Sequence, residues 1–450
     1  MCPTEGMERS GLDDLNDDST VTTVNSDIST NFSTNLPNDV VDKHINQSSK
    51  VYSMSSDNSS NLINSNVETP QILCLPASDD EQFEDEVAII EWKDHVDAFR
   101  AQRQFVNQLA EEAKDHLVNK VEWPERKFAY CSDYCQNMDL PHFGAEQPGE
   151  TYYYSPLKIN CFGSVDFATN KLDAFIYSEA EGKKGGNNVT SLLFKKLKDD
   201  GIIDLAKVKG PGSQLSLIFD NCSGQNKNRM VLRFAQYLVD IQVFKRVQII
   251  FLIMGHTKNI CDRRFKDLKK IFHHRNVYSF PQLTQVLSER NKYYVSVIPV
   301  TTKDFFDWDQ FFNDNKYKKS VKDCSKFHCF YYSDDYEGKI VKQYTINKDK
   351  KVKESIVSFV KNATNEEVTL WKQNLKTKFP KVCENGGLPE IKQVELYTKW
   401  RHLLPNEYQD IMCPKPDDNI LLRVKKQRSE KAKVKRNNKS GTSNNSNNNK

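Results

Sequence analysis

The chain has 450 residues and a formal net charge of +3, and this length fits two or three domains. Its most apolar run, IIFLIM at 249–254, is far shorter than the roughly 20 residues that cross a bilayer, so we expect no membrane segment. The charge is uneven: residues 1–86 carry 17 acidic and 3 basic side chains, whereas residues 423–450 carry 10 basic and 1 acidic. A basic body and tail favour an acidic partner, and DNA is the partner that we expect.

The first 86 residues are rich in Ser, Asn, Asp and Thr and hold few aromatic residues. Such a composition buries too little apolar surface to offset the entropy lost on ordering, so residues 1–86 are predicted to be a disordered acidic and polar arm. The arm begins without the apolar core of a signal peptide, and the 11 cysteines of the chain are irregularly spaced. We therefore expect a reduced, intracellular protein.

A long helix is predicted over residues 87–122. A stripe there advances in alternating steps of four and three, the spacing of one helix face, through Trp92, Val96, Phe99, Arg103, Val106, Ala110, Ala113 and Leu117. We expect this face to pack on the body of the same chain. Because the repeat is strictly heptad, a homodimeric coiled coil through residues 92–117 is the alternative.

Residues 123–298 are predicted to form an α/β core. Strand patterns lie at 127–134, 155–168, 171–179, 214–221 and 246–255, and helix patterns lie at 187–200, 226–241 and 259–275. Three successive strands joined by short turns predict an antiparallel meander, and two further strands, each reached through a helix, add in parallel by right-handed crossovers. This order predicts a ribonuclease H-like mixed five-stranded sheet with flanking helices.

The C-terminal third has less regular patterns. Residues 299–420 are predicted to be a mixed, mainly helical region, with one hairpin in 331–346 and helices at 364–376 and 393–405. Residues 421–450 are predicted to be a basic disordered tail that ends in low-complexity sequence. The run RVKKQRSEKAKVKR in this tail is typical of a nuclear-import signal or a phosphate-binding segment, and a solvated charged tail is the alternative. We expect a nuclear protein.

Three aspartates are the candidate catalytic and metal-binding residues. Asp133 falls in the first predicted strand, Asp220 at the end of the fourth, and Asp262 in the first turn of the helix after the fifth. In the predicted layout the first and fourth strands are neighbours and that helix crosses close to them, so we expect the three carboxylates to converge. Carboxylate oxygens suit Mg²⁺ or Mn²⁺, and two such ions about 4 Å apart can activate the attacking oxygen and stabilise the leaving oxygen at a phosphodiester. We expect Asp133 to bridge the ions, with Asp220 and Asp262 as flanking ligands.

Each acid also has a structural alternative. Asp220 can cap the helix that follows it, and Asp262 can favour a helix N-terminus or pair with Lys266. A zinc site is a further alternative, although no C-x-x-C spacing is present. Its ligands would be cysteines close to the acids in sequence together with a histidine: Cys131, Cys135, Cys222, Cys261 and His256.

Polar residues between the predicted elements are further candidates. His256 precedes the helix of Asp262 and is a candidate catalytic acid for the leaving oxygen, with a turn-capping role as the alternative. The start of the helix after Asp220, where free N–H groups favour phosphate, is a candidate nucleic-acid-binding segment. A polar helix cap is the alternative for its residues, which are Gln225, Asn226, Lys227, Asn228 and Arg229.

The sequence contains the motifs DNCSGQNKNR and GHTKNICDRRF and, upstream of them, DYCQNMDLPH, QPGETYYYSPLKINCFGSVD and EGKKGGNNVTSLL. These motifs resemble those of an uncharacterised group of eukaryotic proteins derived from DDE/D transposases. The resemblance covers about residues 90–420 and implies a ribonuclease H-like nuclease core whose acids are Asp133, Asp220 and Asp262. We therefore expect a transposase-derived, Mg²⁺-dependent nuclease or strand-transferase that acts on DNA; an RNA substrate is not separated by the sequence. The alternative is a domesticated, catalytically inactive nuclear factor that binds DNA or protein.

Overall fold

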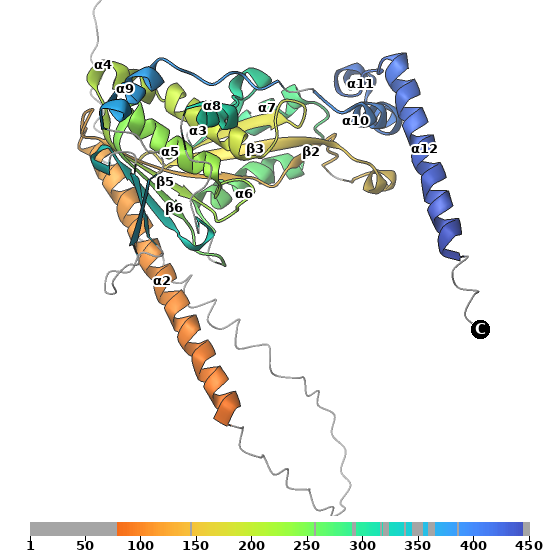
Figure 1. Ribbon diagram of the computed structural model, residues 1–450. Coiled ribbons are helices and arrows are strands. Elements are labelled where there is room, and N and C mark those ends of the chain that lie inside the picture. The colour runs from red at the N-terminus through yellow and green to blue at the C-terminus, as the bar shows by residue number, and fades with distance from the viewer. Residues whose placement is uncertain are drawn as a thin grey trace, which may run out of the picture. The chain divides into compact units, whose positions relative to one another are not determined.

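The computed structural model describes residues 79–443, except 145, 256–257, 290–293, 316, 318–323, 337–338, 344–353, 359–364 and 385–386 (Figure 1). These residues belong to one compact unit, Ala77–Lys450. Most of the predicted N-terminal arm lies outside the described residues, and its end, from residue 79, is already helical. Within the described part of the chain, no helix combines the length and apolar character that crossing a membrane requires.

Within the described residues, ten strands form one mixed sheet, in the order β10-β9-β8-β6-β5-β1-β3-β4-β7, with β2 paired to β3 off this path; Figure 1 shows its central strands. The sequence predicted five strands, so the predicted strand number is wrong. The strands are β1 (Lys127–Tyr134), β2 (Met138–Leu140), β3 (Leu157–Asp166), β4 (Lys171–Ser178), β5 (Gly212–Phe219), β6 (Phe244–Phe251), β7 (Val295–Pro299), β8 (Cys329–Ser333), β9 (Lys339–Gln343) and β10 (Glu354–Ser358).

The five predicted strands form the contiguous middle of this sheet, in the spatial order β4-β3-β1-β5-β6. β3 is antiparallel to β1 and to β4, whereas β5 is parallel to β1 and to β6. The meander and the two parallel additions expected from the element order are therefore confirmed. A mixed α/β sheet with flanking helices is the observed fold class.

Strands outside the five of the predicted core extend the sheet at both ends. β7 adds in parallel to β4, and β8 pairs antiparallel with β6 and continues the sheet through β9 and β10. The predicted hairpin within 331–346 is the β8–β9 pair. Its attachment to β6 is a pairing between distant segments, which local alternation of apolar residues cannot reveal.

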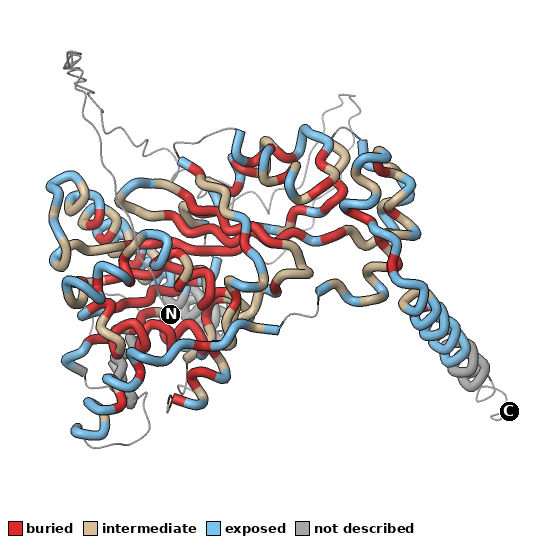
Figure 2. Tube along the Cα trace, turned by 90° about the horizontal axis from the view of Figure 1, so that it is seen from above, coloured by how far each residue is buried: buried red, intermediate tan, exposed pale blue. Residues whose placement is uncertain are grey.

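Helices cover both faces of the sheet, and each face has its own apolar core (Figure 2). The first core packs against α3 (Gly186–Asp199), α4 (Ile202–Lys209), α5 (Arg229–Asp240), α8 (Trp308–Asp314) and α9 (Asn365–Lys376). The second packs against α2 (Asp79–Val118), α6 (Ile260–His273), α7 (Phe280–Glu289), the π-helical turn η5 (Leu396–Trp400) and α11 (Asn406–Met412). Short 3-10 turns are η1 (Gly149–Tyr153), η2 (Thr302–Asp304), η3 (Cys324–Lys326), η4 (Asp334–Tyr336) and η6 (Arg401–Leu403).

The predicted long N-terminal helix exists as α2, and it packs on the body through most of the predicted stripe, with the exceptions of Trp92 and Arg103 at exposed positions. Trp92 of the predicted stripe is 63% exposed, and the buried side chains are Gln102, Leu109 and Ala113. The Gln102 amide binds the end of β6: its Nε2 donates to the Phe251 carbonyl (3.0 Å), and its Oε1 accepts from the Ile253 N–H (3.0 Å). Packing on the same chain through most of the predicted stripe is therefore confirmed, Trp92 and Arg103 are the exceptions, and the homodimer through residues 92–117 stays a prediction.

We expect Gln102→Ala to lower the free energy of unfolding by about 1–3 kcal/mol, because the carbonyl of Phe251 and the N–H of Ile253 lose a buried partner. Urea denaturation measures the change. Gln104, which is exposed on the same helix, is the matched control, and its substitution by Ala should alter stability by less than about 0.5 kcal/mol. Equal stability of the Gln102→Ala variant and the unsubstituted chain would contradict this role for the amide.

The predicted disordered tail begins as a helix, α12 (Asp418–Ser443), so the prediction for residues 421–443 is wrong. α12 packs on α10 (Glu390–Glu395), where the Arg423 guanidinium binds the Glu390 carboxylate at 2.6 Å. Lys, Arg, Glu and Ala are strong helix formers, which explains the helix. The prediction of disorder gave more weight to the high charge of the segment than to this helix propensity. The basic side chains from Lys425 to Lys433 are exposed on this helix.

Candidate functional site

Asp133 and Asp220 are brought together by the parallel pairing of β1 with β5. The register pairs Ser132 with Phe219, so the next residue of each segment is Asp133 at the end of β1 and Asp220 just beyond β5. Side chains alternate along a strand, and continuing that alternation places both aspartates on the face of Ile218, where α6 packs. The predicted adjacency of the first and fourth strands is therefore confirmed.

The Asp133 carboxyl is the most buried of the three acids, with 8% of the residue exposed. Its Oδ1 accepts from the Tyr134 N–H at 2.7 Å, and its Oδ2 accepts from the Asn259 side-chain amide at 3.4 Å. Burial is the main reason that the pKa of Asp133 rises to about 7, and repulsion by the carboxylate of Asp220 and, more weakly, by that of Asp262 adds to the rise. The three acids therefore lie close enough to act on one another electrostatically.

Asp262 is placed by the start of α6. It forms a capping box with Asn259, the N-cap residue: the Asn259 Oδ1 accepts from the Asp262 N–H (3.2 Å), and the Asp262 Oδ2 accepts from the Asn259 N–H (3.0 Å). The alternative that Asp262 stabilises the helix N-terminus is therefore confirmed, and no ion pair of Asp262 with Lys266 is seen in the described part of the chain. Asp262 itself is exposed.

Asn259 is the residue that joins two of the acids. The side-chain Oδ1 of Asn259 accepts from the Asp262 N–H and so caps α6, while the Nδ2 of the same amide donates to Asp133. The sequence analysis noted no role for Asn259, although an Asn three residues before an Asp at a helix start is a recognisable capping signal. The link to Asp133 could not be found in this way because it joins segments 126 residues apart.

Asp220 is held by the loop that follows it rather than by a helix. Its Oδ1 accepts from the Asn226 side-chain amide and from the Cys222 N–H, the latter at 3.3 Å. The N-cap of α5 is Asn228, whose Oδ1 accepts from the N–H groups of the next turn, so the capping alternative for Asp220 is wrong. Asn226 is completely buried, and its Oδ1 is a buried acceptor with no hydrogen-bond partner.

The chemistry of these donors fits a hard divalent cation, because carboxylate and amide oxygens are its preferred ligands. Mutual repulsion of the acids, and the unpaired Oδ1 of Asn226, are features that a bound cation would relieve. Among the described residues, however, no three His, Cys, Asp or Glu side chains are grouped so that they could hold one ion. In the arrangement that the structure describes, Asp133, Asp220 and Asp262 therefore do not form a cation site.

The structure gives no support to the proposed zinc site, and it does not describe His256, the candidate catalytic acid. Cys131, Cys135 and Cys261 are buried free thiols, and the Cys261 Sγ donates to the Cys131 carbonyl at 3.0 Å. They contribute to the apolar core on the α6 face, and the described residues provide no zinc-binding group. His256 lies outside the described residues, so its role stays a prediction.

The five residues predicted to bind nucleic acid are mostly engaged within the chain. Lys227 is 7% exposed, and its Nζ donates to the Ser325 carbonyl at 2.9 Å. Arg229 is exposed, but both carboxylate oxygens of Asp309 accept from its Nη2. Asn226 holds Asp220 and Asn228 caps α5, which agrees with the helix-cap alternative. Binding of nucleic acid by Gln225–Arg229 stays a prediction.

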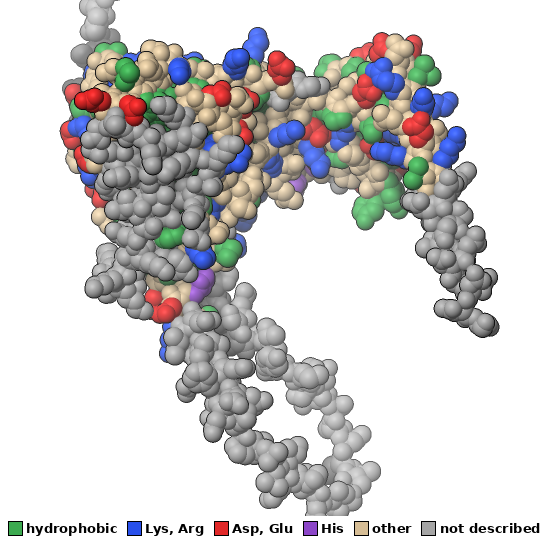
Figure 3. Space-filling model, in the orientation of Figure 1, with side chains coloured by type: hydrophobic (Ala, Val, Ile, Leu, Met, Phe, Trp, Pro, Cys, Tyr) green, Lys and Arg blue, Asp and Glu red, His purple; other side chains and the backbone are tan. Residues whose placement is uncertain are grey.

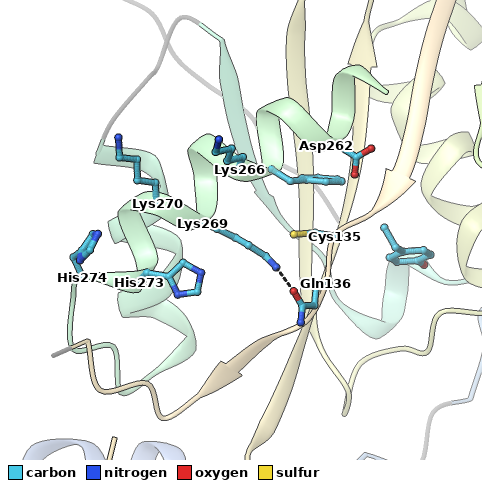
Figure 4. A pocket seen from close by; sticks show the side chains of 10 residues that line it. Cys135, Gln136, Asp262, Lys266, Lys269, Lys270, His273 and His274 are labelled. Atoms are coloured by element: carbon cyan, nitrogen blue, oxygen red, sulfur yellow. Dashed lines mark hydrogen bonds between the residues drawn. The ribbon is translucent and has the colours of Figure 1, made fainter. Parts of the chain in front are cut away.

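A cavity of about 500 Å³ opens beside Asp262, between α6 and the end of β1 (Figure 4). Asp262 lies at one end, and Figure 4 shows lysine and histidine side chains of α6 along the rest. The lining residues are Tyr134, Cys135, Gln136, Asp262, Phe265, Lys266, Lys269, Lys270, His273 and His274. The sequence analysis did not identify this basic surface, although the spacing of Lys266, Lys269, Lys270 and His273 is that of one helix face.

Comparison with known proteins gives little about function. Residues 151–350 match a family described as a domain of unknown function (DUF7869); this range includes Asp220 and Asp262 but not Asp133. No curated protein gives a significant match. A solved structure described as the crystal structure of NurA is aligned at 10% identity with a TM-score of 0.14, covering 66% of this chain and 58% of that one. The chain thus spans less than two thirds of that structure's length, and a similarity this weak carries no argument about fold or activity.

Proposed function

We propose that the chain is a metal-dependent phosphodiester nuclease or strand-transferase that acts on DNA, built on a ribonuclease H-like core of transposase origin. The observation that carries the proposal is geometric: the parallel register places Asp133 beside Asp220, and Asn259 links Asp133 to the start of α6, which carries Asp262. The strand order β4-β3-β1-β5-β6 and the directions of these strands support a core of this kind.

The three aspartates are the proposed ligands for Mg²⁺ or Mn²⁺, with Asp133 between the other two. Two such cations supply an activated attacking oxygen and a stabilised leaving oxygen at a phosphodiester. The chain's own part is positioning: Asn226 and the Cys222 N–H orient Asp220, and Asn259 orients Asp133 while it caps the helix of Asp262. Burial of Asp133 keeps water from one side of the site and strengthens its interaction with a cation.

Nicking of supercoiled plasmid DNA in Mg²⁺ or Mn²⁺ tests this function. We expect the unsubstituted chain to cleave and Asp220→Asn to lose at least about 100-fold in rate, because a lost carboxylate ligand removes several kcal/mol of transition-state stabilisation. The matched control is Asp204→Asn, at an exposed carboxylate of α4 that pairs with Lys207, which should cleave normally. Cleavage that survives Asp220→Asn would refute the assignment of the acids.

A catalytically inactive DNA- or protein-binding factor is the second candidate function. The observation that favours it is that, among the described residues, the acids are not grouped for one cation. DNA binding by a chain that shows no cleavage with either cation would support it. Both candidates fit a nuclear protein, and the exposed basic side chains on α12 provide the segment that an import receptor would bind.

A further inference from the structure

The α6 groove, defined as the cavity lined by Lys266, Lys269, Lys270, His273 and His274 beside Asp262, concentrates positive charge next to the acids. The face of the molecule in Figure 3 shows basic and acidic side chains interspersed, so charge does not mark a binding surface on that face. The α6 groove differs because its single acid, Asp262, lies at one end, and its basic residues follow over three successive turns of the helix (Figure 4).

The lysines of the α6 groove are not neutralised by the protein. Other surface lysines pair with carboxylates, for example Lys372 with Asp334 and Lys399 with Glu395. In the part of the chain that the structure describes, no carboxylate pairs with the three groove lysines. Among the described residues, the side-chain partner of these lysines is the neutral Gln136, whose Oε1 accepts from the Lys269 Nζ at 2.9 Å. Uncompensated cations in a concave surface attract an anionic ligand.

A further cation approaches the same end of β1 from the other side. The Lys184 Nζ donates to the Cys135 carbonyl at 3.0 Å and lies 5.1 Å from the centre of the Tyr134 ring. Both of these partners line the α6 groove. The positive charge near the acids thus comes from two separate segments, α6 and the loop before α3. A helix that merely exposes its lysines to solvent would not account for the lysine of the second segment.

We propose that the α6 groove binds the phosphate backbone of the DNA strand that the acids act on. The stretch from Asp262 to His273 is about 16 Å long, enough for several successive phosphates at about 3.4 Å of helix axis per strand. A small phosphate ligand would require donors that converge on one point, whereas these side chains are spread along the helix. Lysine acts on phosphate as a point charge and does not read bases, so the contacts are independent of sequence.

This inference rests on the proposed function, because it assigns the path that the DNA strand follows along the protein from the catalytic aspartates. It is separate from the phosphate contacts predicted at Lys227 and Arg229, of which the first is buried and the second is paired with Asp309. By contrast, the lysines of the α6 groove line a cavity and have no carboxylate partner in the described part of the chain.

The test measures binding of a fluorescent DNA duplex to the full chain carrying Asp220→Asn, so that no DNA is cut. In that background, we expect the triple change Lys266→Ala, Lys269→Ala and Lys270→Ala to weaken binding at least about tenfold at 0.1 M salt. The slope of log affinity against log salt should fall by about 2 to 3, since up to three counterions are no longer released. Melting curves confirm that each variant is folded.

The control removes the same charge elsewhere, through Lys198→Ala, Lys207→Ala and Lys209→Ala. These exposed lysines lie on α3 and α4, which pack on the other face of the sheet, and their loss should change affinity less than about twofold. Unchanged binding by the α6 triple variant, or an equal loss in the control, would overturn the proposal.

The outcomes also separate this inference from the proposed function. If the α6 triple variant loses binding while the unsubstituted chain never cuts DNA, the α6 groove is a binding site and the nuclease function fails. If the unsubstituted chain cuts DNA through Asp220, and the α6 triple change leaves both binding and cutting intact, the nuclease function holds and the groove assignment fails.

Discussion

Asp133→Asn is expected to stabilise the cation-free protein at high pH and to have little stabilising effect at low pH. The pKa of the folded-state carboxyl is about 7, whereas an unfolded aspartate titrates near 3.9. Because the folded value is raised, the contribution of Asp133 to stability is fully present below about pH 4 and is lost as the pH rises through 7. A difference of about three pKa units corresponds to about 4 kcal/mol at pH 8 and above.

Urea denaturation at pH 5.5 and pH 8, both in EDTA, measures this effect. The advantage of Asp133→Asn over the unsubstituted chain should grow by about 2 kcal/mol between the two pH values. Asp204→Asn, at an exposed carboxylate, is the control and should show no such growth. Stability curves that stay parallel between pH 5.5 and pH 8 would show that the Asp133 carboxyl is not held in a repulsive, desolvated environment.

A second measurement connects the same carboxyl to cation binding. At pH 8 in the unsubstituted chain, Mg²⁺ or Mn²⁺ should raise the melting temperature by relieving the repulsion among the acids. The Asp133→Asn variant has less repulsion to relieve and one ligand fewer, so its shift should be smaller. This readout does not depend on cleavage, and therefore it tests the proposed cation site even in a protein that has lost activity.

Gly163→Val is expected to displace α6 from the sheet. Gly163 lies on β3 directly opposite Asp133, and a Cβ atom there would stand 2.5 Å from ring atoms of Phe265 and 2.8 Å from Leu172. Phe265 is a buried residue of α6, only 4% exposed, and it also lines the cavity beside this helix. Overpacking of this kind costs about 1–3 kcal/mol, so we expect the Phe265 ring to shift and the start of α6, which carries Asp262, to be displaced with it.

Denaturation of Gly163→Val, Phe265→Leu and the double variant forms a cycle that checks the cause. If the clash with the ring is responsible, the smaller side chain at 265 should recover part of the loss, so the double variant should be more stable than the sum of the single changes predicts. Gly149→Val is the control, because a Cβ at Gly149 meets no atom within 4 Å. Additive losses in the cycle would place the strain elsewhere than between β3 and α6.

The part of the fold that local patterns specify was predictable from the sequence. The continuous apolar run of β6 and the helix periodicity of α5 and α6 identified these elements, and their order gave the antiparallel and parallel pairings. The neighbouring positions of Asp133 and Asp220 followed from that order, because the ends of β1 and β5 meet at one edge of the sheet; a shared cation site with Asp262 stays a prediction. These are cases in which the local pattern and the global pairing agree.

What was missed depends on partners that are distant in the chain. The burial of Gln102 on α2 was missed, because this polar residue is buried only where the end of β6 offers it both a donor and an acceptor. The strands beyond β4 and β6 depend on pairing across the sheet, and the loop after Asp220 depends on Asn226 turning its amide back toward that carboxylate. Such contacts leave no periodic signal in the residues that make them.

The amide of Asn259 has a mechanical consequence for the site. It is a neutral tether between a strand and a helix, with one end committed to Asp133 and the other to the backbone at Asp262. A ligand that pulls the beginning of α6 must either carry Asp133 with it or break this tether and replace the donated hydrogen bond. The positions of Asp133 and Asp262 are therefore coupled through the hydrogen bonds of Asn259. A displacement of the exposed start of α6 would change the hydrogen bonding of the buried carboxyl on β1, although Asn259 itself carries no charge.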